Sequence, residues 1–228
     1  MIISKSLYML CIITLGTVCI ACAQDDGHKS PVTPKGNLEK ATFAGGCFWC
    51  MEPPFEKLQG VREVISGYTG GQKKSPTYKE VSAGGTGHVE AIEVMFDPSK
   101  ITYEELLNIF WRQIDPTDPN GQFVDRGSQY RSVIFYHSEE QKKRAEKSKD
   151  DLQKSGRFNK PIVTEILPAG EFYIAEEYHQ DYNKKNPIRY KFYRYNSGRD
   201  QYLEKVWAKE EKKQMSDNKI QQKPSRDE

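Results

Sequence analysis

The position of the cysteines is the feature that most restricts how this chain can fold. Of the five cysteines in 228 residues, three lie in an apolar N-terminal stretch, at positions 11, 19 and 22. The remaining pair, Cys47 and Cys50, would close a loop too short to stabilise a fold as a disulfide. We therefore expect a hydrophobic core rather than a disulfide framework, and the pair is better suited to chemistry.

Length, aromatic content and charge exclude several classes of protein. A chain of 228 residues suits one globular domain with tails. An aromatic share of 11%, with 13 Tyr, excludes a wholly disordered chain. Lys and Arg number 34 against 32 Asp and Glu, so the net charge is only +2. This balance produces no strong field, so we expect no nucleic-acid partner and instead a neutral group or a small ligand.

The N-terminus is typical of an export signal. Lys5 precedes an apolar stretch over 7–20, which is too short for a comfortable membrane span. The Ile-Ala-Cys run at 20–22 resembles a bacterial lipoprotein box, in which Cys22 is acylated. We therefore expect an exported protein of the bacterial cell envelope, anchored to a membrane through Cys22. The small residues at 21–23 leave signal-peptide cleavage open, with a soluble periplasmic or secreted product.

Strands and helices are mixed along the rest of the chain. Alternating or apolar runs predict strands over 40–46, 61–68, 88–97, 129–137 and 161–168. Helical spacing predicts helices over about 50–59, 102–114, 138–155, 175–186 and 200–208. Pro53 and Pro54 are compatible with the first of these helices only in its first turn. Because the elements do not alternate strictly, we expect an α+β fold.

The chain divides into four parts. Residues 1–22 are the predicted signal, and residues 23–38 are polar, with two prolines and two glycines, as in a flexible tether. We expect one folded domain over 39–207. The remaining residues, 208–228, are rich in Lys, Glu and Gln without aromatics, which predicts a disordered charged tail.

The most informative segment is Gly-Gly-Cys-Phe-Trp-Cys at 45–50. Cys47 stands between a predicted strand and a predicted helix, so that the helix N-terminus favours its thiolate, which is the nucleophile. Phe48 and Trp49 place apolar surface beside it, which suits a small apolar part of a substrate. Cys50 is within reach to form a disulfide with Cys47 after the chemistry.

Other interpretations of this segment remain. It is compatible with a structural disulfide, with a thioredoxin-like redox motif, or with half of a zinc site. A zinc site needs two further ligands, and the four histidines, at 28, 88, 137 and 179, show no paired spacing. We therefore expect no metal.

Five segments together resemble one enzyme family. Gly-Cys-Phe-Trp-Cys resembles the active-site signature of the A-type peptide methionine sulfoxide reductases. Four further runs resemble that family's blocks, in order and at its spacing: Ser-Pro-Thr-Tyr at 75–78, Gly-His-Val-Glu-Ala at 87–91, Asp-Arg-Gly-Ser-Gln-Tyr-Arg at 125–131 and Ala-Glu-Glu-Tyr-His-Gln-Asp-Tyr at 175–182. The resemblance covers about residues 39–207. It implies a two-layer sandwich with a central mixed, ferredoxin-like sheet, and no cofactor.

The resemblance also implies an activity, the reduction of peptide-bound or free methionine-S-sulfoxide to methionine in protein repair. Cys47 would attack the sulfoxide sulfur and become a sulfenic acid. Glu90 would supply the proton to the departing oxygen, which Tyr78 and Tyr130 would hold by hydrogen bonds. Asp125 would orient the site or bind a water. On the residues alone, an outward-facing Glu90, ordinary half-buried tyrosines and a turn Asp are the alternatives.

Substrate contacts and recycling follow from the same resemblance. Phe48 and Trp49 are expected to bind substrate, together with His179 and Tyr182, which lie three apart on one predicted helical face. Residues 208–228 contain no cysteine, so Cys50 is the expected disulfide partner of Cys47, and a thioredoxin-like reductant would restore the thiols. We expect a monomer. A thiol–disulfide oxidoreductase, or a peptide-binding lipoprotein with incidental cysteines, is the alternative.

Overall fold

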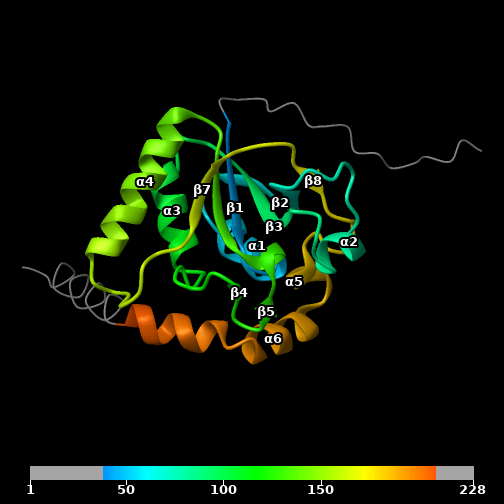
Figure 1. Ribbon diagram of the computed structural model, residues 1–228. Coiled ribbons are helices and arrows are strands. Elements are labelled where there is room, and N and C mark those ends of the chain that lie inside the picture. The colour runs from blue at the N-terminus through cyan, green and yellow to red at the C-terminus, as the bar shows by residue number, and fades with distance from the viewer. Residues whose placement is uncertain (1–37, 209–228) are drawn as a thin grey trace, which may run out of the picture. The chain divides into compact units, whose positions relative to one another are not determined.

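The computed structural model describes residues 38–208, in which a mixed six-stranded sheet is covered by helices (Figure 1). Its strand order is β7-β6-β1-β3-β2-β8. These strands are β1 (Glu39–Gly45), β2 (Val61–Thr69), β3 (Val89–Phe96), β6 (Ser132–Tyr136), β7 (Glu165–Pro168) and β8 (Tyr173–Ile174). Strands β6 and β7 are parallel and the other neighbours antiparallel, so the predicted α+β fold with a central mixed sheet is confirmed.

Two of the helices begin at N-cap residues, Thr102 and Ser138, whose side chains accept a hydrogen bond from the first turn. They are α1 (Phe48–Glu56), α2 (Tyr78–Ser82), α3 (Tyr103–Trp111), α4 (Glu139–Lys154), α5 (Tyr182–Lys185) and α6 (Pro187–Asn196), with a 3-10 turn η1 (Ser128–Tyr130) and a further helix over 199–208. Thr102 caps α3 as predicted, through a reciprocal pair of hydrogen bonds with Glu105. A short hairpin joins β4 (Gly121–Gln122) to β5 (Asp125–Arg126). No helix within 38–208 is both long and apolar enough to span a membrane.

The core lies between the sheet and the helices α1 and α3. Phe43 in β1 is fully buried and stacks on Phe55 of α1 at 5.4 Å and on Phe110 of α3 at 5.1 Å. Burying one such side chain contributes about 1.5–3 kcal/mol. In β3, Ile92 and Val94 belong to the same cluster. Because successive residues of a strand alternate between faces, Glu90 also points to the helix-covered face.

Helix α1 begins two residues earlier than predicted, at Phe48. Pro53 and Pro54 consequently lie inside the helix rather than in its first turn. Pro54 has no N–H to donate to the carbonyl of Cys50, four residues before it. That carbonyl instead accepts a 3.0 Å hydrogen bond from Arg194 Nη1. A side chain distant in the sequence thus satisfies the acceptor that the proline leaves open.

The segments 161–168 and 175–186 are less regular than predicted. Only Glu165–Pro168 is a strand, and only Tyr182–Lys185 is helical. A helix over 175–186 is prevented because Asp181 is left-handed, with φ 53°. Gln180 instead binds both backbone groups of Ser66 at 2.9 Å, which ties this segment to β2. The predicted signal, the tether and nearly all of the tail lie outside the described residues.

Candidate active site

The turn between β1 and α1 presents Cys47 as the N-cap residue of α1. Gly46 permits this turn because its φ is +83°, and a Cβ there would lie 2.6 Å from Gln122 Cβ and 2.9 Å from Arg199 Nη2. Both cysteines are free thiols. Cys47 is 7% exposed and Cys50 is fully buried, with the Cys50 N–H donating to the Cys47 carbonyl at 3.0 Å. The predicted pair therefore lies together at one helix end.

The two thiols lie in opposite electrostatic surroundings. Burial raises the pKa of Cys47, as do its hydrogen bond to Cys50 and the Glu90 carboxyl. The pKa of Cys50 is lowered to about 7, first by the hydrogen bond from Cys47 and, against the effect of burial, by the guanidinium groups of Arg199 and Arg194. The prediction that the helix N-terminus favours a thiolate at Cys47 therefore differs from the structure. Burial, Cys50 and the nearby carboxyls raise the pKa of Cys47, and Cys50 is the more acidic thiol.

Glu90 is a buried acid beside the first turn of α1. It is 2% exposed, and its Oε2 accepts a 3.1 Å hydrogen bond from the backbone N–H of Phe48. Burial raises the pKa of Glu90 to about 8, although the bond from Phe48 opposes this, and Asp125 raises it further. The side chain is thus largely protonated near neutral pH and can donate a proton.

Two phenols and a second carboxyl come from separate loops to the same place. Tyr78 begins α2, Tyr130 ends η1, and Asp125 begins β5; all three are half-buried. Burial raises the pKa of Tyr78 to about 12 and that of Tyr130 well above its ordinary value, and Glu90 raises both further. Asp125 accepts a 2.6 Å hydrogen bond from the Tyr193 hydroxyl. Both phenols are therefore neutral donors within electrostatic range of Glu90.

An aromatic wall, formed by Phe48, Trp49, His179 and Tyr182, lies beside the polar groups. Trp49 stacks on Tyr182 with ring centres 3.7 Å apart and an interplanar angle of 4°, and its Nε1–H donates to His179 Nδ1 at 3.0 Å. The His179 ring also contacts Phe48 at 4.9 Å and Tyr78 at 4.3 Å. Burial lowers the pKa of His179 to about 4, so it is a neutral acceptor. His179 and Tyr182 thus meet on Trp49, although they do not share a helical face.

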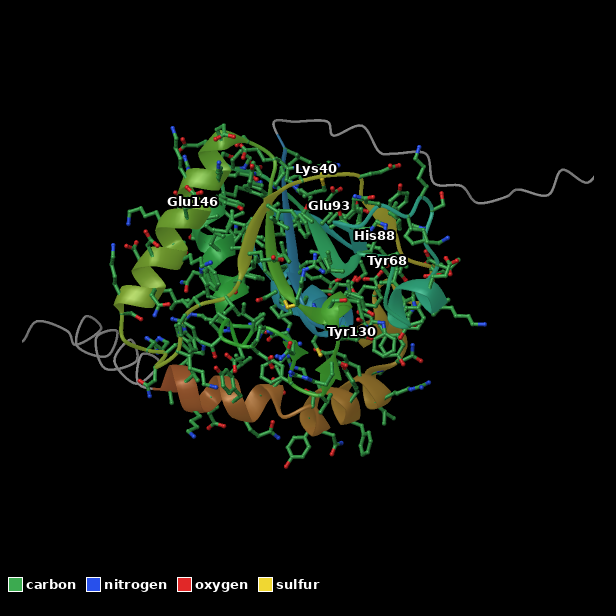
Figure 2. The ribbon with its side chains drawn as sticks, in the orientation of Figure 1. Lys40, Tyr68, His88, Glu93, Tyr130 and Glu146 are labelled. Carbon is green, nitrogen blue, oxygen red and sulfur yellow. The ribbon has the colours of Figure 1, made fainter. Side chains whose placement is uncertain are left out.

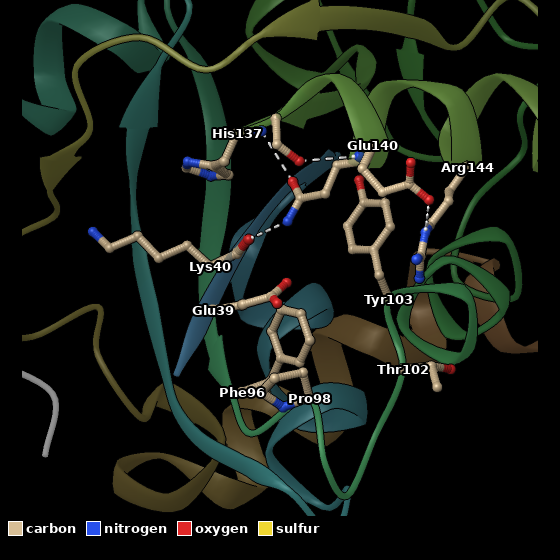
Figure 3. Close-up of a pocket in the computed structure, with 11 residues that line it drawn as sticks. Glu39, Lys40, Phe96, Pro98, Thr102, Tyr103, His137, Glu140 and Arg144 are labelled. Atoms are coloured by element: carbon tan, nitrogen blue, oxygen red, sulfur yellow. Dashed lines mark hydrogen bonds and ion pairs between the residues drawn. The ribbon is translucent and has the colours of Figure 1, made fainter. Parts of the chain in front are cut away.

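A cavity of about 530 Å³ lies elsewhere, at the opposite end of β1 (Figure 3). Lys40, Tyr103 and His137 are among its lining residues, and no predicted site residue is. Figure 2 shows Lys40 and Tyr130 at opposite ends of the sheet. β1 spans about 20 Å at ~3.3 Å per residue, so this cavity is separate from the cysteines.

An acidic cluster on α1 is neutralised by a lysine. Glu52, Glu56 and Asp181 bring carboxylate oxygens within 4.8 Å of one another. Lys184 Nζ lies 2.6 Å from Glu56 and 2.7 Å from Asp181, so an ammonium group already pairs with two of the three carboxylates.

The sequence is similar to proteins of one family. The family model described as peptide methionine sulfoxide reductase matches residues 39–211. A peptide methionine sulfoxide reductase MsrA of Listeria monocytogenes is 60% identical over 173 residues, which cover 76% of this chain and 98% of that protein. One from Bacillus licheniformis is 56% identical over 176 residues, 77% of this chain and 97% of the other. The chain belongs to the peptide methionine sulfoxide reductase family.

Solved structures of this reductase family share the fold. Mxr1 from Saccharomyces cerevisiae in reduced form has a TM-score of 0.62 and 39% identity, over 66% of this chain and 86% of the other. Methionine sulfoxide reductase A of Corynebacterium diphtheriae has a TM-score of 0.60 and 37% identity, over 66% of this chain and 76% of that one.

Sequence reasoning did not identify several residues that support the reductase site. Tyr193 and Arg194 lie on α6, a helix that was not predicted, although Pro187 at its start is a usual signal for one. Glu176 joins two parts of the site, because its carboxylate accepts from the Tyr78 N–H and from the Tyr68 hydroxyl, both at 2.8 Å. No local pattern marks such long-range partners. The predicted lipid attachment at Cys22 lies outside the described residues.

Proposed function

We propose that this reductase converts peptide-bound or free methionine-S-sulfoxide to methionine, with Cys47 as nucleophile and Glu90 as acid, and so repairs oxidised proteins. Members of the family are peptide-methionine (S)-S-oxide reductases. The hydrogen bond from the Phe48 N–H to Glu90 is the observation that most directly supports this assignment of residues. It holds the Glu90 side chain, which burial keeps largely protonated, beside the N-cap residue Cys47. A nucleophile and a proton donor are thus held at one point.

The first half of the reaction is an oxygen transfer between two sulfur atoms. The Cys47 sulfur attacks the sulfoxide sulfur while Glu90 protonates the oxygen, which ends on Cys47 as a sulfenic acid. The proton lost by the Cys47 thiol replaces the one that Glu90 gives up, so no net proton is consumed. The sulfoxide is reduced to methionine and Cys47 is oxidised. Tyr78 and Tyr130 would hold the oxygen by hydrogen bonds as negative charge develops on it.

The aromatic wall supports an apolar contact for the substrate. Trp49 is half-buried and is held rigidly by Tyr182 and His179, while Phe48 lies beside it. A methionine side chain presents a methyl group and a methylene stem, which suit contact with rings. Asp125 would act indirectly, since its carboxylate is bound to the Tyr193 hydroxyl.

In the second half, Cys50 would attack the Cys47 sulfenic acid and release water, leaving a disulfide. The hydrogen bond between the two side chains and the lowered pKa of Cys50 support this step. A thioredoxin-like dithiol protein would then reduce the disulfide. The reductant would attack Cys47, which is the more exposed of the two cysteines.

One assay tests the proposed activity. The protein is incubated with a peptide that contains methionine-S-sulfoxide and with dithiothreitol, and the products are weighed by mass spectrometry. A loss of 16 Da from the S epimer, with the R epimer unchanged, is the expected result. Reduction of insulin disulfides without loss of oxygen from the peptide would instead favour the thiol–disulfide oxidoreductase.

Location, assembly and domain limits complete the proposal. We infer export to the cell envelope with lipid attached at Cys22. Replacing this residue, as in Cys22→Ala, should then move the protein from the membrane fraction to the soluble fraction, and unchanged fractionation would favour a soluble form.

We also infer that residues 39–207 form the catalytic domain. A chain limited to these residues should keep activity and elute as a monomer in size-exclusion chromatography.

We describe the sheet as the centre of a two-layer, ferredoxin-like sandwich. The inner strand order β6-β1-β3-β2, in which all neighbours are antiparallel, supports this description.

A further inference from the structure

Arg199 is a buried charge that has no direct ion pair among the described residues. The residue is 0% exposed and begins the helix over 199–208. Its Nη2 donates to the Gly45 carbonyl at 3.1 Å, its Nη1 donates to the Gln113 carbonyl, and its Nε has no hydrogen-bond partner within the described chain. Its Cζ lies 4.6 Å from the centre of the Phe123 ring, and its charge lowers the pKa of Asp125 against the effect of burial. Burying a guanidinium without a direct ion pair is unfavourable, so its position calls for a functional reason.

The guanidinium lies beside the backbone that carries both thiols. On one side it contacts Gly45 and approaches Gly46, the residue before Cys47. On the other side its Nη1 lies 3.8 Å from the sulfur of Met51, the residue after Cys50. A positive charge between these two points can stabilise an anion that forms on either sulfur.

The surrounding charges favour Cys50 as the site of that anion. Cys47 faces the carboxyls of Glu90 and Asp125, both of which disfavour a thiolate there, whereas of the two only Asp125 also raises the pKa of Cys50. Arg194, the other nearby cation, is already paired with Asp200 at 2.7 Å and holds the Cys50 carbonyl. Arg199 has no such direct ion pair, although its charge also acts on Asp125, and its effect in lowering the pKa of the Cys50 thiol is larger than that of Arg194.

We propose that Arg199 is the counter-ion of the Cys50 thiolate, a positioning residue for the step that forms the Cys47–Cys50 disulfide. This proposal rests on the proposed function. In that step the Cys50 thiolate attacks the sulfur of the Cys47 sulfenic acid, an S–S bond forms and the S–O bond breaks. The departing hydroxide takes up the proton that Cys50 lost and leaves as water.

The same charge assists the return of the enzyme to its reduced form. The reductant's thiolate attacks Cys47, and Cys50 is the leaving group. A thiol of lower pKa leaves faster, so the Arg199 field accelerates this cleavage as well. The buried guanidinium thus has its anionic partner in the reduced state and loses it in the disulfide.

The test separates the two halves of the reaction in three variants. Arg199→Met removes the charge at similar length, Arg199→Lys keeps it, and Arg189→Met is the matched control, an exposed arginine on α6. Each reduced protein receives one equivalent of sulfoxide peptide, and quenched samples report methionine and remaining sulfenic acid separately. In Arg199→Met, methionine should appear at the wild-type rate. Disulfide formation at pH 7 should fall about tenfold or more and recover near pH 9, since one pKa unit is a factor of ten.

Arg199→Lys should keep most of the rate at pH 7, and Arg189→Met should match the wild type throughout. The same pH profile of disulfide formation in Arg199→Met and the wild type would overturn the proposal. Absence of methionine from the wild type itself would instead refute the proposed function, so the two failures are distinguishable.

A second measurement follows the ionisation of Cys50 by thiolate absorbance at 240 nm. In Cys47→Ala, Cys50 is the remaining thiol of the domain and has lost the hydrogen bond from Cys47, so the titration midpoint of this variant is the reference. Adding Arg199→Met should raise that midpoint by about one pH unit, whereas adding Arg199→Lys should leave it nearly unchanged. Equal midpoints in Cys47→Ala with and without Arg199→Met would overturn the proposal.

Discussion

The backbone N–H of Phe48 donates a 3.1 Å hydrogen bond to Glu90 Oε2, which ties the proposed acid to the first residue of α1. The first N–H groups of a helix have no partner within the helix, so this donor is free to bind a side chain. Cys47 is the N-cap of the same helix. One hydrogen bond between α1 and β3 therefore sets the position of the proposed nucleophile relative to the proposed acid.

Glu90→Gln should slow methionine formation by about 10²–10⁴-fold, the usual contribution of a general acid. The amide retains an oxygen that can accept the Phe48 N–H, so the site should keep its shape and its affinity for substrate. Single-turnover rates near neutral pH test this directly. A rate equal to that of the wild type would show that another group supplies the proton.

The pH dependence of the first half-reaction should follow the same carboxyl. Because burial raises the pKa of Glu90 to about 8, its acid form is present below that pH and is lost as the pH rises through it. The single-turnover rate should therefore fall above about pH 8 in the wild type. Glu90→Asp should retain such a fall from a lower rate, whereas Glu90→Gln should show no step near pH 8.

Stability should respond to the same titration. The folded-state pKa of Glu90 lies above its unfolded value, so its protonation stabilises the fold below the unfolded pKa of 4.5, and this contribution is lost as the pH rises through about 8. Glu90→Gln removes the ionisation. Its Tm should therefore match the wild type at pH 5 and exceed it at pH 9. A Tm of Glu90→Gln below the wild type at pH 9 would contradict this account of the buried carboxyl.

Tyr78→Phe and Tyr130→Phe should act on one oxygen atom. Each substitution removes one hydroxyl donor, and the remaining phenol can still hold the sulfoxide oxygen. The double variant should therefore lose more in the single-turnover rate than the product of the two single losses. Tyr136→Phe, on β6, is a control outside the cluster and should leave the rate unchanged. Strictly multiplicative losses would show that the two phenols act on separate groups.

The strand and helix pattern was largely predictable because it is local. Alternation predicted β3 as a half-buried strand, and Thr102 marked the start of α3, whereas the inward position of Glu90 was implied by the family resemblance and not by the pattern alone. The ionisation of Cys47 was not predictable in this way. The helix N-terminus is visible in the sequence, but the burial and the carboxyls that outweigh it come from segments far along the chain.

The residues around the cysteines were missed for the same reason. Arg194 binds the Cys50 carbonyl only because Pro54 leaves that carbonyl free, and Arg199 reaches Gly45 across 154 positions. Asp181 broke a predicted helix because Glu52 accepts its N–H and Gln180 binds Ser66. Such contacts depend on the packed fold, and no spacing along the chain encodes them.

Gly46→Ala should destabilise the domain more than Gly156→Ala. Both glycines have positive φ, +83° and +67°, which costs an alanine about 1–2 kcal/mol. A Cβ at Gly156 meets nothing within 4 Å, whereas one at Gly46 would lie 2.6 Å from Gln122 Cβ. Overpacking adds roughly 1–3 kcal/mol at Gly46 alone. Urea unfolding measures the difference, and equal free energies of unfolding would show that the turn adapts.

Cys50→Ser should separate reduction of the sulfoxide from recycling. Cys47 and Glu90 remain, so one equivalent of methionine per enzyme should form at close to the wild-type rate. Turnover with thioredoxin should then stop, because no other cysteine lies between 51 and 228 to condense with the sulfenic acid. Cys47→Ser is the matched control and should lose both the methionine burst and turnover, since a hydroxyl is a poor nucleophile at neutral pH.

Turnover with dithiothreitol distinguishes the two ways in which Cys47 can be returned to its thiol: through the Cys47–Cys50 disulfide, or by direct reduction of the sulfenic acid. Cys47 is 7% exposed in the free enzyme, so dithiothreitol can reach a sulfenic acid there, and Cys50→Ser should retain part of its turnover with that thiol. The adduct on Cys47 should be trapped by dimedone in Cys50→Ser and escape trapping in the wild type, where Cys50 consumes it. Normal thioredoxin-driven turnover in Cys50→Ser would mean that the protein reductant attacks the sulfenic acid directly, and the internal disulfide would then not be needed.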